Sequence, residues 1–279
     1  GGSLSRDTDY TVTYAVKPGE AGKLGANAKP QDAGTYVVTV TGTGDYKDSF
    51  TEELVIAPKA VVITPTAGQQ KTYGEEDPAL TYSTDLTTGS ALETAFQAAV
   101  TGKLARAKSG DEDGAYAGAY EISLGNLSAG MNFALSLDET KAYLTIVAAA
   151  QTLTKVKDLS VLKDKTLTAE QLSSAVSGAK GGLTFSLVEA TKYATLTDNT
   201  LTVCDFTDPD LPDMEKGTVQ VKAVAAALDV NGDGEAEYAA NDTGVTFDVV
   251  VKNLTVDKAD APNAPTGLKG VAPTLKGGS

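Results

Sequence analysis

Apolar and polar residues alternate with a period of two along most of the chain, which is the pattern of half-buried strands. The clearest runs lie at 10–16, 36–41, 120–124, 183–187, 219–221 and 247–251. Each run is short and ends at Gly, Asn, Asp or Pro, as strands followed by tight turns do. Because strands and helices do not alternate regularly, we expect antiparallel sheets.

Two segments depart from this alternation. Residues 91–99 (ALETAFQAA) are mostly good helix formers. Thr168 and Gln171 form a capping-box pattern that predicts a helix over 169–177, with Gly178 placed to end it. The pattern therefore predicts an all-β fold with one or two short helices as decorations.

A repeated order of motifs indicates where modules begin and end. Residues 33–56 and 117–146 both carry Ala-Gly-x-Tyr, an alternating strand, a Gly-rich turn and a strand ending in Ile, and a looser copy covers 217–251. New strand material follows almost at once, which is typical of modules in series. We expect modules at 1–57, 58–147 and 148–253, with a linker or the lead-in to a further module at 254–279.

The first of these modules is short. A complete sandwich of this kind needs roughly 75–100 residues. We therefore expect the module at 1–57 to be N-terminally truncated and the chain to be a piece of a longer protein.

Asp32, Gly34 and Tyr36 resemble the D-x-G-x-Y tyrosine corner of immunoglobulin-type domains, in which the Tyr hydroxyl reaches upstream backbone. Gly118 and Tyr120 repeat the corner without the Asp. The resemblance implies Ig-like β-sandwich modules, which we expect to form an elongated array without an internal disulfide.

A more specific resemblance covers most of residues 58–147, which are similar to the YGX-type MBG module of bacterial surface proteins. Its motifs are 73–82 (YGEEDPALTY), 102–106 (GKLAR), 118–122 (GAYEI) and 125–133 (GNLSAGMNF). Residues 9–56 resemble a related extracellular repeat, and residues 181–251 resemble a bacterial Ig-like repeat. Such modules stand in tandem in secreted or wall-attached proteins, often adhesins. The resemblance implies a non-catalytic extracellular role, neighbouring modules of the same polypeptide as partners, and no catalytic or cofactor-binding residues.

Composition excludes several classes of partner and chemistry. With 23 Lys and Arg against 37 Asp and Glu, the formal charge is −14, so we expect neither nucleic-acid binding nor self-association, and predict a monomer. No apolar run approaches the roughly 20 residues of a membrane span.

The chain has no His, which excludes Ser–His and Cys–His nucleophile pairs. Its one cysteine, Cys204, is expected to be a small buried apolar residue. We predict that it is not an enzyme.

The sharpest candidate for a ligand site is residues 229–237 (DVNGDGEAE), which fit the first half of a calcium loop. If calcium binds, Asp229, Asn231 and Asp233 are the expected ligands. Loop position 12, where an EF-hand has a bidentate acid, is Ala240. The other interpretation is a polar hairpin tip between strands near 217–227 and 245–251.

For the other polar and aromatic groups we expect a structural role rather than a ligand-binding one. The acidic clusters 75–77 and 111–113 are expected to be solvated loop tips. Five tyrosines alternate with small polar residues and are expected in cores before any sugar-stacking role. They are Tyr10, Tyr14, Tyr36, Tyr82 and Tyr120.

These observations predict a stalk or spacer segment of a secreted or wall-attached bacterial surface protein. One alternative is an adhesin module that binds a host or microbial glycan or protein, which requires an exposed aromatic or apolar patch. A second is the accessory region of a surface hydrolase whose catalytic domain lies elsewhere.

Overall fold

The computed structural model describes residues 3–107, 116–163, 165–191, 194–203 and 216–252. The described chain forms two compact units. Unit 1 contains the chain up to Ala149 together with Asp229–Ala239, and unit 2 contains the rest. The module boundaries expected at residues 57 and 147 stay predictions.

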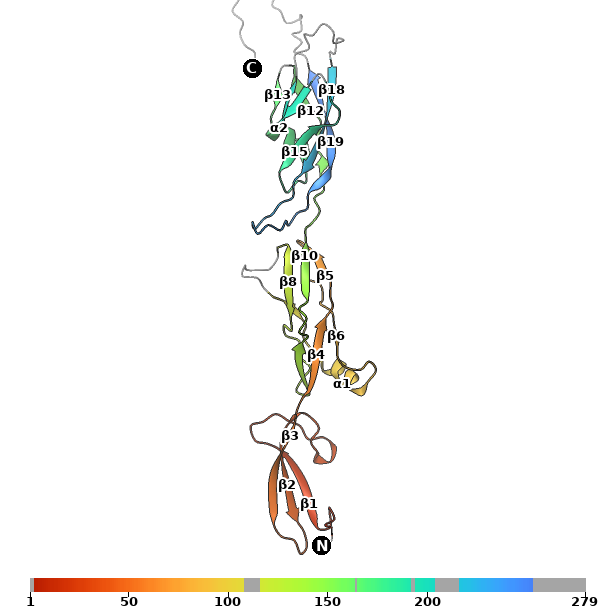
Figure 1. Cartoon of the computed structure of the whole chain (residues 1–279), viewed down its shortest axis with the longest axis vertical. Coiled ribbons are helices and arrows are strands. Elements are labelled where there is room, and N and C mark those ends of the chain that lie inside the picture. Colours follow the sequence, from red (N-terminus) through yellow and green to blue (C-terminus); the bar gives the residue numbers. More distant parts are fainter. Residues whose placement is uncertain (1–2, 108–115, 164, 192–193, 204–215, 253–279) are drawn as a thin grey trace, which may run out of the picture. The chain divides into compact units, whose positions relative to one another are not determined.

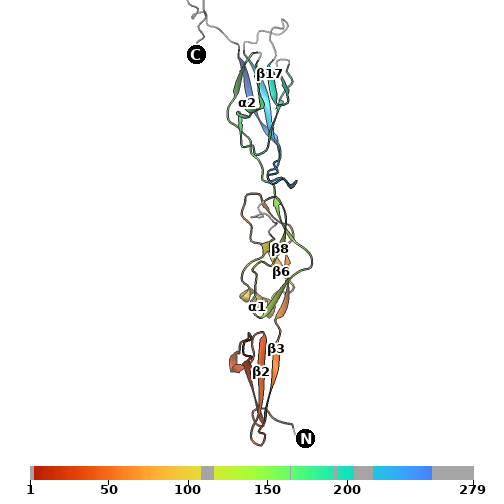
Figure 2. The same cartoon turned by 90° about the vertical axis from the view of Figure 1, so that its left-hand side faces the viewer.

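The first part of unit 1 is a single antiparallel sheet in the order β1-β2-β3 (Figure 1). Its strands are β1 (Tyr10–Val16), β2 (Gly34–Gly42) and β3 (Ser49–Ile56), and a 3-10 turn, η1 (Ala26–Ala28), lies between the first two. The register pairs Val12 with Val40 and Tyr14 with Val38, so the alternation puts the apolar side chains on one face, as predicted. Among residues 3–57 only Ala33 and Tyr36 are buried, so no second layer covers this sheet (Figures 1 and 2).

The second part of unit 1 has two sheets around one core. The four-stranded sheet has the order β5-β10-β8-β7 and the three-stranded sheet has the order β6-β4-β9. The strands are β4 (Lys59–Pro65), β5 (Gln69–Thr72), β6 (Tyr82–Thr84), β7 (Ala105–Arg106), β8 (Gly118–Ser123), β9 (Phe133–Leu137) and β10 (Tyr143–Val147). Ile63, Ile122 and Leu144 from both sheets meet in the core, which makes this part a sandwich.

The predicted helix over residues 91–99 is present as α1 (Ala91–Ala99). The Ser90 hydroxyl caps it by accepting from the Glu93 amide. Phe96 is fully buried, and its ring lies edge-on to Phe133 with the centroids 5.5 Å apart. The helix therefore contributes a side chain to the core as well as covering it.

Unit 2 is built around a larger core. Its main sheet has the order β12-β19-β18-β15, a second sheet has β13-β17-β16, and β11 pairs with β14. The strands are β11 (Thr154–Lys155), β12 (Leu159–Leu162), β13 (Thr166–Leu167), β14 (Val176–Ser177), β15 (Leu183–Leu187), β16 (Ala194–Thr197), β17 (Thr200–Val203), β18 (Lys216–Ala225) and β19 (Asn241–Lys252). Leu201, Val221 and Phe247 are almost completely buried there, and the Phe185 ring lies edge-on to Phe247.

The all-β fold with two short helices is confirmed, but two details of the prediction were wrong. The second helix, α2 (Ala169–Ser173), has the predicted capping box and ends four residues early. Val176 and Ser177 pair instead with β11. A helix this short is marginal, so pairing and burial of Val176 outweigh its extension.

The expectation of antiparallel sheets was also wrong in part. Among the strands that the structure describes, three pairs are parallel: β4 with β9, β5 with β10, and β12 with β19. The partners lie far apart in the chain, with other strands of the second sheet between them. The lack of strand–helix–strand units excludes only parallel pairs that are joined by a helix. Two strands of one sheet can also be parallel when the chain between them passes through the other sheet of the sandwich.

Both tyrosine corners form as predicted. The Tyr36 hydroxyl donates to the carbonyl of Asp32 at 2.7 Å, and the Tyr120 hydroxyl donates to the carbonyl of Tyr116 at 3.0 Å. Gly34 has φ +154°, and a Cβ there would lie 2.2 Å from the Ala21 carbonyl oxygen, so only glycine fits. The corners fix where β2 and β8 begin.

Candidate functional site

The loop of residues 229–237 joins β18 to β19, as the hairpin interpretation predicted. Asp229 accepts the backbone N–H groups of Gly232 at 2.6 Å and Gly234 at 2.8 Å. Asp233 accepts from the Glu235 amide at 2.8 Å and from the Asn231 side chain at 2.9 Å. Hydrogen bonds, led by that of the Glu235 amide, hold the pKa of Asp233 below its ordinary value. The carboxylates of this loop therefore stabilise its own turns.

Calcium binding at Asp229, Asn231 and Asp233 stays a prediction. In the part of the chain that the structure describes, no three Asp, Glu or Cys side chains are grouped closely enough to hold a metal ion. Ala240, at the loop position where an EF-hand has its bidentate acid, directly precedes strand β19. The loop is followed by this strand and not by a helix, so it does not have the geometry of an EF-hand.

The end of this loop is buried, which the sequence analysis missed. Glu237 has no exposed surface, and both of its carboxylate oxygens accept backbone N–H groups, from Ala117 and from Val230. Tyr238 packs edge-on against Tyr73, with ring centroids 5.4 Å apart. Burial raises the pKa of the Tyr73 hydroxyl, and Tyr238 and Glu237 add to this effect. The run of apolar residues around Glu237 (Ala236 and residues 238–240) was the available signal that the loop does not end in solvent.

Residues 75–77 are exposed, as expected for a loop tip, but Asp77 also forms ion pairs that the sequence analysis did not predict. Its carboxylate pairs with Lys71 Nζ and with Arg106 Nε, both at 2.7 Å. The Lys71 side chain is 7% exposed and that of Arg106 is 12% exposed. The Arg106 guanidinium lies over the Tyr120 ring, 5.0 Å from its centroid. Asp77 thus ties the loop after β5 to β7 and β8.

The charges of this cluster determine the protonation of Asp77. Burial by itself would raise the pKa of the carboxyl, but hydrogen bonds and charges of Lys71 and Arg106 outweigh burial and hold the pKa below its ordinary value. The cluster is a structural ion-pair network, since its groups bind one another.

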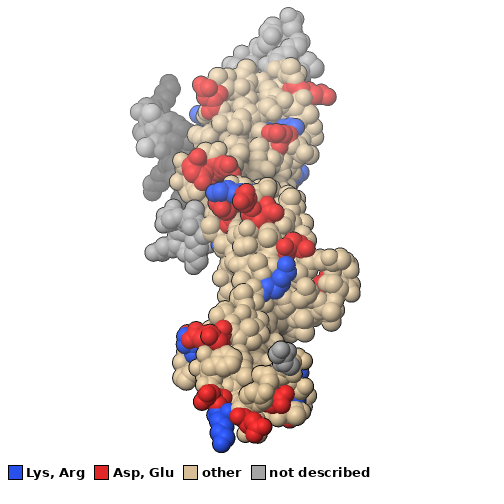
Figure 3. Space-filling view, turned by 60° about the horizontal axis from the view of Figure 1, so that its bottom comes forward, with Lys and Arg blue, Asp and Glu red and all other residues tan. Residues whose placement is uncertain are grey.

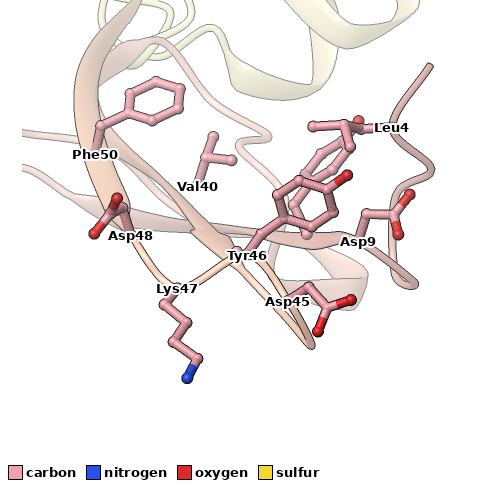
Figure 4. A pocket seen from close by; sticks show the side chains of 10 residues that line it. Leu4, Asp9, Val40, Asp45, Tyr46, Lys47, Asp48 and Phe50 are labelled. Atoms are coloured by element: carbon pink, nitrogen blue, oxygen red, sulfur yellow. The ribbon is translucent and has the colours of Figure 1, made fainter. Parts of the chain in front are cut away.

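A hollow of about 610 Å³ opens on the uncovered sheet at β1, β2 and the turn before β3. Leu4, Tyr46 and Phe50 line it and are about half exposed, at 50%, 48% and 59%. Figure 4 shows Tyr46 and Phe50 on either side of Val40, with Lys47 pointing away from the rings. The lining of this hollow therefore includes two aromatic rings that are about half exposed.

The remaining predicted residues are distributed over the fold. Tyr36 and Tyr120 are buried, whereas Tyr10, Tyr14 and Tyr82 are half-buried. Cys204 and the acidic cluster 111–113 lie outside the described residues.

Among the charged side chains on the face shown in Figure 3, the acidic ones predominate. In Figure 3, Asp and Glu side chains are spread over the visible face with a few Lys and Arg among them and no continuous basic patch. Within the described residues, no helix has the length and apolar character needed to cross a membrane.

Comparisons with known proteins agree with the resemblance drawn from the motifs of residues 73–133. Residues 61–145 match the family model described as MBG domain (YGX type). This match confirms the resemblance stated for residues 58–147. No curated protein matches the sequence.

Solved structures that resemble the chain include two cadherins. Drosophila N-cadherin EC1-4 is 10% identical, with 89% of this chain and 68% of that chain covered and a TM-score of 0.31. Mouse protocadherin-24 EC1-3 is 13% identical, with coverages of 90% and 91% and a TM-score of 0.30. Scores this low support no conclusion about function.

Proposed function

We propose that the chain is a non-catalytic stalk or spacer segment of a secreted or wall-attached bacterial surface protein, and that it presents other domains away from the envelope. The MBG match over residues 61–145 supports the surface location, since modules of this type are repeats of bacterial surface proteins.

The observation that carries the proposal is that each unit closes its own apolar core. One core is made of residues between Val61 and Leu144, and the other of residues between Val161 and Val251. Each contains residues of two sheets and a helix, so neither core needs a ligand to be buried. Self-sufficient units in series suit a positional role.

The chemistry of the described side chains also supports a non-catalytic role. The chain has no His. The carboxylates of Asp77 and Glu237, which lie in or near buried surroundings, are bound to other groups of the protein. Asp77 binds Lys71 and Arg106, and Glu237 binds two backbone amides.

Small-angle X-ray scattering of the purified chain tests the stalk. An extended array of modules should have a radius of gyration near about 30 Å, whereas one globule of this length should have about 19 Å. A value at the lower figure, independent of protein concentration, contradicts the proposal.

The hollow at Tyr46 and Phe50 favours a second candidate, an adhesin module that binds a glycan. Exposed aromatic rings supply faces on which sugar rings stack, and Asp9, Asp45 and Asp48 at its margin can accept hydroxyl hydrogens.

A printed array of host and microbial glycans, probed with the labelled chain, tests this candidate. Binding should disappear when Tyr46→Ala and Phe50→Ala are combined. It should persist in Val55→Ala, an exposed apolar position (65%) on the opposite face of β3. An array without signal, or binding that survives the double substitution, contradicts it.

A further inference from the structure

Segment 229–239 is covalently part of the β18–β19 hairpin but packs as part of unit 1. The chain crosses between the units three times, after Ala149, Leu228 and Ala239, and each crossing is called a passage. The geometry points to a clasp: we infer that Glu237 anchors segment 229–239 to unit 1 and thereby pairs the first passage with the third. This inference does not depend on the stalk proposal, because it rests on contacts within each unit and on chain connectivity alone.

The anchor is the Glu237 carboxylate. It is fully buried, and its two oxygens accept from the Ala117 amide at 3.2 Å and the Val230 amide at 2.5 Å. A buried carboxylate without partners is strongly unfavourable, so both amides must be in place when Glu237 is inserted. One amide lies just before β8 and the other within the segment itself, so a single side chain joins the segment to the body of unit 1.

Backbone hydrogen bonds continue this attachment on both sides of Tyr238. The Ala149 amide donates to the Glu237 carbonyl at 2.8 Å, and the Ala239 amide donates to the Ala149 carbonyl at 2.9 Å. Ala149 and Tyr238 form a parallel bridge. The edge-on packing of Tyr238 on Tyr73 adds an apolar contact to the same place.

The hydrogen bonds of Ala149 lie where the chain leaves unit 1. Ala149 is the last residue of unit 1 before the first passage into unit 2, and Ala239 is the last before the third passage. The two passages therefore start from residues that are hydrogen-bonded to each other. Within unit 2 the chain is held in the same way, because the Asn241 side-chain amide donates to the Gln151 carbonyl at 2.5 Å. Ala149 in unit 1 and Gln151 in unit 2 are thus each hydrogen-bonded to a residue of the returning chain.

The clasp gives the Glu237 carboxylate a structural role. Both Glu237 oxygens are occupied by amides, so this side chain is not available as the missing acidic ligand of a calcium loop. An amide side chain offers only one acceptor in place of two, so glutamine can satisfy only one of the two donors.

Hydrogen exchange of the whole chain, followed by mass spectrometry or NMR, tests the clasp. In the wild-type chain the amides of Ala117, Ala149 and Ala239 should be protected. Glu237→Ala should raise exchange at these amides on the order of tenfold to a hundredfold, since one buried partner is lost. Glu237→Gln should have a smaller effect. The matched control Glu235→Gln changes an exposed acid two residues away and should leave exchange unchanged.

A second variant separates release of the clasp from unfolding of unit 1. Ala239→Pro removes the donor to Ala149 and leaves Glu237 intact, and it should raise exchange at Ala149 and neighbouring amides while the core amide of Leu144 stays protected. The inference is overturned if the wild-type amides of Ala149 and Ala239 exchange as fast as exposed ones. It is equally overturned if neither Glu237→Ala nor Ala239→Pro changes their exchange.

Discussion

At the scale of single residues, two tyrosine hydroxyls perform the same task in two different sheets. Tyr36 and Tyr120 each donate to the carbonyl four residues upstream, and each follows a glycine at positive φ. Tyr36 also accepts from the Lys23 amide at 3.0 Å, so its hydroxyl holds the long loop between β1 and β2. The β1-β2-β3 sheet has no second layer, so the buried Tyr36 ring supplies most of its buried apolar contact.

Removal of that hydroxyl should therefore be costly. Tyr36→Phe should lower the free energy of unfolding by about 1 kcal/mol or more, because the Lys23 amide loses its acceptor. Urea denaturation measures the change. Tyr14→Phe, on the face of the neighbouring strand, is the control and should change stability by less than about 0.5 kcal/mol.

The ion pairs of Asp77 should make stability depend on pH. A carboxyl whose pKa is depressed on folding contributes stability above its unfolded pKa of about 3.9, and this contribution is lost as pH falls through the folded pKa. Asp77→Asn should lower stability at pH 7 by about 1 kcal/mol, because the Asp77 side chain is 41% exposed and solvent screens its pairs with Lys71 and Arg106.

The gap between wild type and Asp77→Asn should close as pH falls below about 4. Chemical denaturation at a series of pH values measures it. Glu76→Gln, the exposed neighbouring acid, should give no such pH-dependent gap; an equal gap would contradict the role assigned to the ion pairs.

At the scale of elements, both helices depend on their first residues. α2 has five residues and no intrinsic stability, so its capping box and the buried side chain of Leu172 keep it in place. α1 is longer, but it too begins with a hydroxyl cap, Ser90.

Loss of either cap should destabilise one unit only. Thr168→Ala should reduce the stability of unit 2 by about 1 kcal/mol, and Ser90→Ala should do the same in unit 1. Native-state hydrogen exchange reports on each unit separately, so each variant is the other's control. Equal losses in both units from either change would contradict local capping.

Elements with a strong local signal were predictable from sequence. The alternation at 10–16, the corner at Tyr36 and the helix at 91–99 all depend on residues close together in the chain. The parallel pairs, the ion pairs of Asp77 and the burial of Glu237 depend on partners far away. Period-two patterning states which face of a strand is apolar, but not which strand lies beside it.

At the scale of the whole molecule, the two cores imply separate responses to core damage. Phe247→Ala should lower the stability of unit 2 by about 3–5 kcal/mol, because a buried ring packed on Phe185 is removed. Calorimetry should show the corresponding transition shifted down while the transition of unit 1 remains. Phe50→Ala, at a largely exposed ring in unit 1, should change stability by about 0.5 kcal/mol or less.

The parallel pairs of early with late strands have a consequence for the order in which the protein folds. β5 pairs with β10 and β12 pairs with β19, so neither core can be completed until its late strand has left the ribosome. During synthesis these two cores stay incomplete for longer than cores made of local hairpins would, whereas the consecutive strands β1, β2 and β3 depend on no late strand. Each core therefore gains its final packing late in synthesis, after most of its strands have been made.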